Sequence, residues 1–515
     1  MAKKLLFLTL LFLISIPAFA QIVDTSWVRR YNGPGNGYDK ANALTVDSSG
    51  NVYVTGYSYG GSETSYDYAT IKYYPNGDTA WVRRYNGPAD GTDAAHALAV
   101  DRFGNVYVTG ASDGSGTKSD FTTIKYYPDG DTVWVRRYNG AANSWDDAKT
   151  IALDGSGYIY VAGDSWGTHE DYLTIKYDPD GNELWVRRYN GPGNGEDHVR
   201  DMALDNSGNV YLTGGSDGGG ENDDYLTIKY YADGDTAWIA RFDGPAGREE
   251  DAAAIAVDES GSVYITGGMA RPGRMGDYAT IKYYPNGDTA WLRWYSGDSL
   301  DFATDIALDD SGNVYVSGTI SWENYYDYAT VKYDSDGNEI WACRYNGSAN
   351  LNDRVSDIAV SGSGQVYVTG FSDYSWDIYP YPPPDYATLK YYSDVNTAWV
   401  RTYNGPGDDA DAPSAIAIDN SGNVYVTGYS YGNETWEDYA TIKYVQFYLC
   451  GDVNSDREIN LSDPICLANY YFGNPCEINP WSSDVNCDIL PNLGDAIIIA
   501  NVYFGKPGFE LNCCE

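Results

Sequence analysis

The chain has 515 residues, with 73 acidic and 33 basic side chains and a formal net charge of −40. This excess of negative charge argues against nucleic acid as a partner, because a phosphate backbone is bound by a basic surface. It suits a soluble secreted protein, and it suits calcium, which takes oxygen ligands. The 51 Tyr and 57 Gly residues combine strand formers with turn formers and so predict an all-β chain with many tight turns.

Residues 1–20 have the features of a secretory signal peptide. A positively charged start is followed by an apolar run over 5–17 and by a small-x-small cleavage site at 18–20. The apolar run is too short for a membrane span, and no other segment is hydrophobic enough to be one. We therefore expect a secreted protein without a membrane span, located outside the cell or on its surface.

A four-segment pattern repeats eight times over residues 21–448. In its first copy the segments are 43–47, 51–56, 67–73 and 81–85, and each is rich in β-formers and bounded by turn residues. The Trp that opens the fourth segment returns every 50 to 58 residues, which suits one four-stranded blade per copy. The pattern predicts an eight-bladed β-propeller. An open solenoid is the alternative, but it requires polar caps at both ends and neither end has one.

The repeats begin and end out of phase. The first of them is a lone fourth segment at 27–31, whereas the last copy stops at its third segment, 438–444. We expect residues 24–32 to form the outer strand of the blade made by 415–444, because this pairing closes the ring and removes two exposed sheet edges.

The repeat resembles the SBBP β-propeller repeat family. The resemblance rests on Val-Asp-x-Ser-Gly-Asn-Val-Tyr-Val-Thr-Gly, on Asp-Tyr-Ala-Thr-Ile-Lys-Tyr and on Asp-Gly-Asn-Glu-Leu-Trp at 180–185, and it covers roughly 420 residues. It implies a secreted bacterial propeller and assigns no chemistry. The family is usually associated with seven blades, so the eight copies depart from it.

Two carboxylates recur in every copy. One is followed by Lys five residues later, and its repetition indicates a role in capping turns or linking blades. Its members are Asp67, Asp120, Asp171, Asp224, Asp277, Asp327, Asp385 and Asp438. The other lies just before the innermost strand, and we favour a hydrogen-bonded turn carboxylate over a ligand for a cation in the channel mouth. Its members are Asp39, Asp93, Asp146, Asp197, Glu250, Asp301, Asp353 and Asp411.

Connections within a copy alternate in length, which separates two faces. Short uniform turns share one face, and long variable loops share the other, which is free for binding. The predicted ligand-binding side chains on the long-loop face are Tyr374, Trp376, Tyr379, Tyr381, Trp322, Tyr325 and Trp436. They could stack on a sugar ring or anchor a protein, and packing of the loops is the alternative. Further aromatic residues there are Tyr57, Tyr59, Tyr66, Trp145, Trp166, Tyr326, Tyr429 and Tyr431.

The sequence shows no catalytic constellation. The three histidines, His96, His169 and His198, lie in three different copies without a nucleophile motif near any of them. Many pairs of carboxylates could be considered for glycoside cleavage, and no pair stands out from the others. We therefore assign no catalytic residue.

Residues 449–515 contain a different duplication, of two loops 32 residues apart. Each has oxygen-bearing side chains at places one, three, five, nine and twelve and a backbone carbonyl available at place seven, which is calcium-loop spacing. The predicted Ca²⁺ ligands are Asp452, Asn454, Asp456, Glu458, Asn460 and Asp463 in the first loop, and Asp484, Asn486, Asp488, Leu490, Asn492 and Asp495 in the second. The apolar runs that follow, 464–472 and 496–504, predict short helices.

This tail resembles a type I dockerin, which implies a cohesin-type protein as partner. Arg457 and Ile489 depart from the usual Gly at place six of the loop. Six of the seven cysteines lie in the tail, where export permits disulfides whose pairing the sequence does not fix. The alternative is a calcium-stapled stability module without a cohesin partner.

Two functions remain open from the sequence. The first is a non-catalytic secreted scaffold that binds glycan or a surface protein on its long-loop face and is attached through the calcium-dependent tail. The second is an extracellular polysaccharide hydrolase or lyase carried by the same tail. Converging carboxylates in an asymmetric cleft would favour the enzyme.

Overall fold

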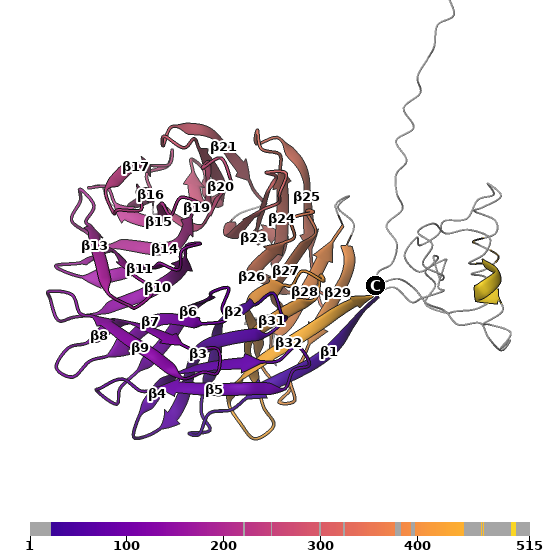
Figure 1. Ribbon diagram of the computed structural model, residues 1–515. Helices are drawn as coiled ribbons and strands as arrows, with labels where there is room; N and C mark the ends of the chain where they lie inside the picture. The colour runs from indigo at the N-terminus through magenta and orange to yellow at the C-terminus, as the bar shows by residue number, and fades with distance from the viewer. Residues whose placement is uncertain are drawn as a thin grey trace, which may run out of the picture. The chain divides into compact units, whose positions relative to one another are not determined.

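A computed structural model describes residues 22–447, apart from 220–221, 249, 298–299, 323–324, 376–382 and 393–396, together with 465, 467 and 496–500. Within 22–447 the described chain forms 32 strands in eight four-stranded sheets, arranged as blades around a ring (Figure 1). The predicted all-β, eight-bladed propeller is confirmed.

The strands of each blade are given from the innermost outward. The first blade consists of β2 (Asp39–Val46), β3 (Val52–Gly61), β4 (Ser65–Tyr73) and β5 (Thr79–Tyr85), and the second of β6 (Asp93–Val100), β7 (Val106–Asp113), β8 (Ser119–Tyr126) and β9 (Thr132–Tyr138). The third blade consists of β10 (Asp146–Leu153), β11 (Ile159–Trp166), β12 (Glu170–Tyr177) and β13 (Glu183–Tyr189), and the fourth of β14 (Asp197–Leu204), β15 (Val210–Asp217), β16 (Asp223–Tyr230) and β17 (Thr236–Phe242). The fifth blade consists of β18 (Asp251–Val257), β19 (Val263–Arg271), β20 (Arg274–Tyr283) and β21 (Thr289–Tyr295), and the sixth of β22 (Phe302–Leu308), β23 (Val314–Trp322), β24 (Tyr325–Tyr333) and β25 (Glu339–Tyr345). The seventh blade consists of β26 (Asn352–Val360), β27 (Val366–Tyr374), β28 (Asp385–Tyr391) and β29 (Thr397–Tyr403), and the eighth of β30 (Asp411–Ile418), β31 (Val424–Tyr431), β32 (Glu437–Phe447) and β1 (Ile22–Tyr31).

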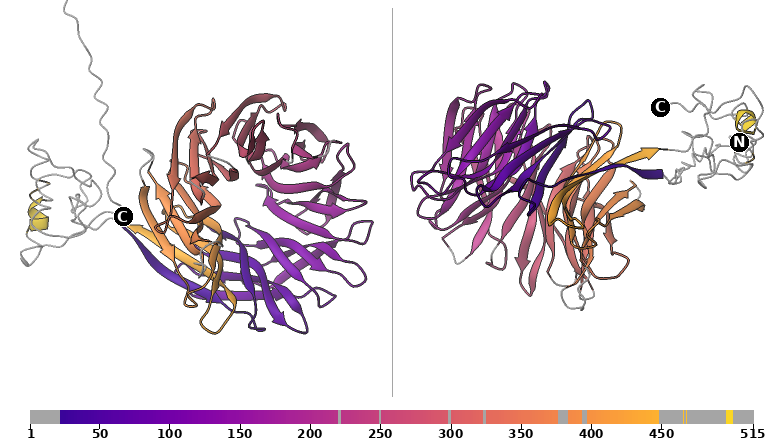
Figure 2. Two further views of the ribbon diagram at one scale, coloured as in Figure 1. Left: turned by 180° about the vertical axis from the view of Figure 1, so that it is seen from behind. Right: turned by 90° about the horizontal axis from the view of Figure 1, so that it is seen from below.

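The N-terminal strand closes the ring. β1 pairs with β32 as the outer strand of the eighth blade, and the two lie side by side in every view (Figures 1 and 2). Arg30 on β1 binds Asp438 on β32 at 2.9 Å, across 408 positions of sequence. The prediction for residues 24–32 is confirmed, because this strand supplies the partner that β32 otherwise lacks.

The innermost strands contact one another around the whole ring, including β30 with β2. Each second strand is buried along Val-Tyr-Val-Thr-Gly, since neighbouring blades cover both of its sides. The closing Gly of this motif is required by a β-bulge in the innermost strand. A Cβ on Gly56 would lie 2.0 Å from the carbonyl oxygen of Lys40, beside the register shift between Ala41 and Ala43.

Hydrogen bonds between side chains and short turns join neighbouring blades. Trp81 donates its indole N–H to the carbonyl of Pro128 in the next blade at 3.0 Å, and Lys72 donates to the same carbonyl at 3.2 Å. The same carbonyl receives both groups at Pro179, Ala232, Ser335 and, across the closing seam, Pro75. The repeated Trp and Lys residues therefore link blades.

The repeated Asp of the third strand anchors an Arg from the fourth strand of its own blade. Arg84 binds Asp67 at 2.6 Å and also donates to the hydroxyl of Tyr31 in the preceding blade. The equivalent ion pairs are Arg30–Asp438, Arg137–Asp120, Arg188–Asp171, Arg241–Asp224 and Arg344–Asp327. The fifth blade has Trp294 at this place, and Arg271 from β19 binds Asp277 instead. The predicted structural role is confirmed for these seven aspartates, whereas the seventh blade, which contains Asp385, has Thr402 at the position of the arginine.

The repeated carboxylates at the start of the innermost strands cap the long loops. All eight are at most 1 % exposed. Asp39 accepts hydrogen bonds from the backbone N–H of Gly33 at 2.7 Å and of Tyr59 at 2.9 Å, and the other seven each accept one from an equivalent Gly. They are hydrogen-bonded turn carboxylates, as expected.

The chain divides into two compact units, Thr25–Val445 and a second unit made of Met1–Asp24 and Gln446–Glu515. In the second unit, residues 465, 467 and 496–500 are helical, within the two predicted helices. The twelve predicted calcium ligands and the six tail cysteines lie outside the described residues. Among the residues described, no helix is long and apolar enough to cross a membrane.

Candidate functional site

The blades differ most where their innermost strands begin, on the long-loop face. When the loop-capping carboxylate is counted as position one, the second position carries Lys40, Ala94, Asp147, His198, Asp251, Phe302, Arg354 and Ala412. The fourth position carries Asn42, His96, Lys149, Arg200, Ala253, Thr304, Ser356 and Ser414. The propeller fold needs only the residues that repeat, so the variety at these two positions points to a functional role. The bulge in each strand adds the fourth residue as an extra one, and bulges re-aim side chains beside functional sites.

Titratable residues gather on the second to fifth blades in a cluster that we call the polar arc. Its members are His96, Asp147, Lys149, Asp164, Glu170, Glu196, His198, Arg200 and Asp251. The sequence placed His96 and His198 in separate copies, and the fold connects them through this chain of ion pairs. They were missed because their partners come from neighbouring blades; the available signal was their departure from the repeat at the second and fourth positions.

The first part of the polar arc joins two strands of neighbouring blades. His96 Nε2 on β6 lies 3.1 Å from Asp147 Oδ1 on β10, and Lys149 Nζ binds the other oxygen of Asp147. Burial raises the pKa of Asp147, but His96 and Lys149 outweigh it and lower that pKa. This carboxylate is therefore held ionised between two nitrogen groups.

The second part surrounds one imidazole with three carboxylates. His198 Nδ1 lies 3.0 Å from Glu170 Oε2 and 3.3 Å from Asp164 Oδ2, and His198 Nε2 lies 3.5 Å from Glu196 Oε2. The hydrogen bond to Asp164 raises the pKa of His198 to about 9, although burial lowers it. Burial and the charge of Asp164 raise the pKa of Glu170.

Two cavities flank these groups. One, of about 210 Å³, is lined by Trp145, Asp147, Lys149, Asp164 and Glu170, with Ala111 and Ser119. The other, of about 420 Å³, is lined by Asp251, Met269 and Phe302 with small residues around them. Arg200 binds Asp251 at 2.6 Å and so connects the polar arc to the second cavity.

Aromatic residues gather at the closing seam between the eighth and first blades, in what we call the seam patch. It consists of Tyr38, Tyr57, Tyr59, Tyr66, Tyr429, Tyr431 and Trp436, with Lys40 and Glu437 among them. Trp436 is 52 % exposed and its ring lies 5.2 Å from that of Tyr38. Burial, and then the charge of Glu437, raise the pKa of Tyr57 and of Tyr431 to about 12.

The other predicted ligand residues lie apart from the seam patch. Trp322 is 39 % exposed, faces Tyr325 in the β23–β24 register, and has the guanidinium of Arg344 at 4.5 Å from its ring centre. Tyr374 is buried, with its ring 5.1 Å from Phe371. Trp376, Tyr379 and Tyr381 lie outside the described residues.

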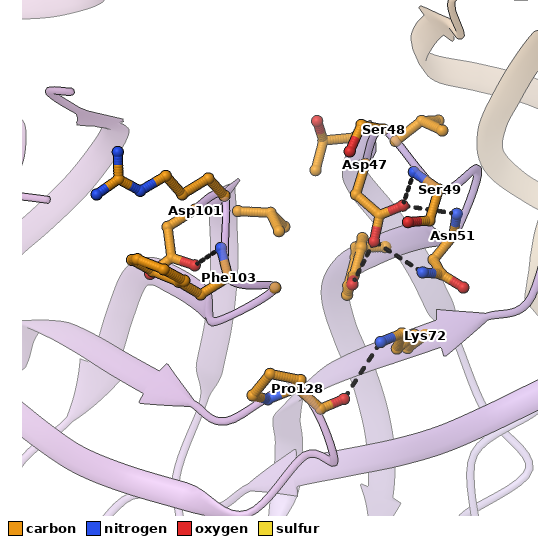
Figure 3. Close-up of a pocket in the computed structure, with 14 residues that line it drawn as sticks. Asp47, Ser48, Ser49, Asn51, Lys72, Asp101, Phe103 and Pro128 are labelled. Carbon is orange, nitrogen blue, oxygen red and sulfur yellow. Dashed lines mark hydrogen bonds between the residues drawn. The ribbon is translucent and has the colours of Figure 1, made fainter.

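The short-turn face has a cavity of about 500 Å³ between the first two blades (Figure 3). Its polar groups are already used by the fold. Asp47 accepts hydrogen bonds from the backbone and side chain of Asn51 and from the N–H of Ser49, and Lys72 donates to Pro128 (Figure 3). Because the same turns recur around the ring, this cavity is a product of the repeat, and the long-loop face carries the candidate sites.

Comparison with known families identifies the repeat. The family model of the SBBP β-propeller repeat matches residues 26–62, 80–116, 133–169 and 399–434. These four segments are therefore similar to SBBP repeats. Each match runs from a fourth strand into the first two strands of the following blade, which is the frame set by the closing strand. Searched by sequence, the curated proteins give no match.

Several solved structures resemble this chain at low sequence identity. The polysaccharide lyase Uly1 is 8 % identical, with a TM-score of 0.43 over 82 % of this chain and 98 % of its own. A family PL25 ulvan lyase bound to a saccharide is 12 % identical, with a TM-score of 0.38 over 73 % and 95 %. The β-propeller domain of the trilobed protease from Pyrococcus furiosus is 8 % identical, with a TM-score of 0.40 over 68 % and 92 %.

Proposed function

We propose that this propeller is a secreted binding protein that holds a polysaccharide or glycan on its long-loop face, at the seam patch. The observation that carries the proposal is the gathering of seven aromatic residues from two blades around Lys40 and Glu437. Flat rings that are partly exposed provide apolar faces for a sugar ring, and phenol and carboxylate oxygens provide hydrogen bonds for its hydroxyls.

The seam patch is supported by rigid structure. Tyr57 and Tyr59 lie on β3 and Tyr429 and Tyr431 on β31, so strands rather than loops position these rings. The core beneath them is shared by both blades, with Ala41 and Val52 packed together with Tyr425 and Tyr439. A preorganised aromatic surface loses little conformational freedom when it binds, which favours affinity.

The tail gives the proposal its second part, attachment to an extracellular or cell-surface assembly. What supports it is the duplicated calcium-loop spacing over 452–463 and 484–495 and the resemblance to a type I dockerin. In this proposal Ca²⁺ orders the tail and a cohesin-type protein receives it. The alternative, a tail stapled by calcium without a cohesin, leaves the binding role of the propeller unchanged.

Binding of soluble polysaccharides, measured by affinity electrophoresis and confirmed by calorimetry, tests the seam patch. Trp436→Ala should weaken binding of the polysaccharide that the wild type retains by about tenfold or more, the loss typical of a central aromatic anchor. Trp145→Ala is the matched control, since Trp145 is also 52 % exposed on this face but lies in the third blade. Equal binding by wild type and Trp436→Ala, or a loss confined to Trp145→Ala, would place the ligand elsewhere.

The polar arc favours a second candidate, an extracellular polysaccharide hydrolase or lyase. His96 Nε2 lies 3.1 Å from Asp147 Oδ1, an imidazole–carboxylate pair of the kind used in general acid–base catalysis, and Asp147 lines a cavity. New reducing ends would reveal a hydrolase, and absorbance of unsaturated products would reveal a lyase. Activity that Asp147→Asn abolishes would establish the enzyme, and no product from any retained polysaccharide would leave the binding role alone.

A further inference from the structure

Three ligand-type side chains from two blades converge at one point of the polar arc. Asp164 and Glu170 come from the facing ends of β11 and β12, and His198 comes from the start of β14 in the next blade. One oxygen of each carboxylate and one imidazole nitrogen lie within 4.8 Å of one another. The two measured edges, from His198 Nδ1 to Glu170 Oε2 and to Asp164 Oδ2, are 3.0 and 3.3 Å.

These edges match those of a metal coordination sphere. Ligand atoms about 2.1 Å from a common ion stand about 3.0 Å apart at octahedral angles and about 3.4 Å apart at tetrahedral angles. We propose that Asp164, Glu170 and His198 bind a divalent transition metal ion, with further coordination positions open for water or a ligand. Two carboxylates with one imidazole suit Mn²⁺, whereas Ca²⁺ takes oxygen ligands alone.

The remaining atoms of these side chains are held as in known metal sites. Asp164 Oδ1 accepts a hydrogen bond from the backbone N–H of Val199 at 2.8 Å, which leaves Oδ2 directed to the site. Glu196 lies 3.5 Å from His198 Nε2, on the opposite side of the ring from Nδ1. A carboxylate on the far nitrogen of a metal-binding histidine fixes its orientation and raises its basicity.

The charge around the site favours a dication. Asp164, Glu170 and Glu196 are three carboxylates around one imidazole, and Lys149 lies 4.0 Å from Asp164 with its own closer partner in Asp147. With the imidazole neutral, as a metal requires, the local charge is negative.

The repeat supplies an internal comparison. At the seam, the positions of Glu170, Asp164 and His198 carry Glu437, Tyr429 and Lys40. There the ammonium of Lys40 lies 5.6 Å from the ring centre of Tyr429 and near Glu437, so a fixed cation occupies the equivalent place. One arrangement of three positions thus holds a lysine in one interblade groove and, in the proposal, a metal ion in another.

Mn²⁺ titration of the metal-stripped full chain, followed by the loss of the electron paramagnetic resonance signal of free Mn²⁺, tests the site. Excess Ca²⁺ is added to the titration so that it occupies the oxygen-only sites proposed in the tail. The cysteine sulfurs of the tail are soft ligands, which disfavour Mn²⁺. We expect one Mn²⁺ per chain in the wild type, none in His198→Ala, and binding weakened 10- to 100-fold in Glu196→Gln. Glu437→Gln is the matched control and should bind as the wild type does.

Two results would overturn the site: no Mn²⁺ uptake by the wild type, or equal uptake by His198→Ala. Unfolding temperatures without metal, measured for each variant, establish that the folded proteins are being compared, and Glu170→Gln provides a second loss variant that keeps the side-chain shape. The outcome is independent of polysaccharide binding, because no residue of the seam patch takes part.

Discussion

Glu250 is the single glutamate among the eight loop-capping carboxylates, and it makes the stability of the propeller depend on pH. It is 1 % exposed and accepts a hydrogen bond from the N–H of Gly244. Burial, with the nearby charges of Asp243 and Asp224, raises the pKa of Glu250 from 4.5 to about 7, although the Gly244 hydrogen bond lowers it. The perturbation to make is Glu250→Gln, which keeps the shape and the acceptor oxygen but has no charge to gain.

The sign follows from the raised pKa. The folded protein holds the Glu250 proton more tightly than the unfolded chain, so this contribution to stability is complete below pH 4.5 and is lost as the pH rises through 7. The rise in the pKa of Glu250 from 4.5 to about 7 corresponds to a loss of about 3 kcal/mol in the free energy of unfolding at pH 9. With an unfolding entropy of about 2 cal/mol/K per residue over the 25–445 unit, that is about 3 °C in melting temperature.

Differential scanning fluorimetry from pH 5 to pH 9 measures the effect. The melting temperature of Glu250→Gln should equal that of the wild type at pH 5 and should be about 3 °C higher than that of the wild type at pH 9. Glu259→Gln removes the same charge from an exposed turn and should show no such divergence. If the two melting curves of Glu250→Gln and wild type stayed parallel across the range, the buried-carboxylate argument would be refuted.

Three further predictions concern the links within and between blades and the tail. Trp81→Ala removes a buried indole that donates to Pro128 and should lower the free energy of unfolding by about 3–5 kcal/mol, whereas Trp81→Phe should cost about 1 kcal/mol; urea unfolding measures both. Arg271→Met separates the buried Asp277 from its guanidinium and should cost about 3 kcal/mol in the same assay, and adding Trp294→Arg should recover most of it, since every other blade except the seventh, which has Thr402, places an Arg there. Chelation of Ca²⁺ should make residues 449–515 sensitive to proteolysis while 25–445 stays intact on a gel, and resistance of the tail without Ca²⁺ would contradict the calcium assignment.

The sequence was sufficient for the ring because every blade repeats the same information. The eight-fold return of Trp81 and its equivalents set the number of blades, and the unmatched segment at 27–31 identified the closing strand. The repeated Asp and Lys residues were correctly assigned to the fold for the same reason. The arrangement in the fifth blade was not foreseen. There Arg271 on β19 binds Asp277, and Trp294 replaces the usual arginine on β21. Either strand can place an arginine beside this carboxylate, and the sequence pattern does not show which one does.

The polar arc was not predicted, because it is built across blades and the departures from the repeat were not compared between neighbouring copies. Asp164 and His198 stand 34 positions apart, a separation without meaning until the ring places β11 beside β14. The seam patch was foreseen in part: the aromatic residues were assigned to the right face, but only closure brings Tyr38 to Trp436. In a repeat protein, positions that repeat build the scaffold, and positions that depart from the repeat are the first place to look for function.

The strand that closes the ring also sets the order in which the protein can be finished. Arg30 and Asp438 lie 408 positions apart, so β1, which is synthesised near the start of the chain, has no partner strand until β32 has been synthesised. During that interval the free β1 of one molecule and the open edge of β32 in another are complementary, which is the situation that gives strand-exchanged dimers. Completion of the ring is therefore a competition between an intramolecular contact and an intermolecular one, and dilution favours the monomer.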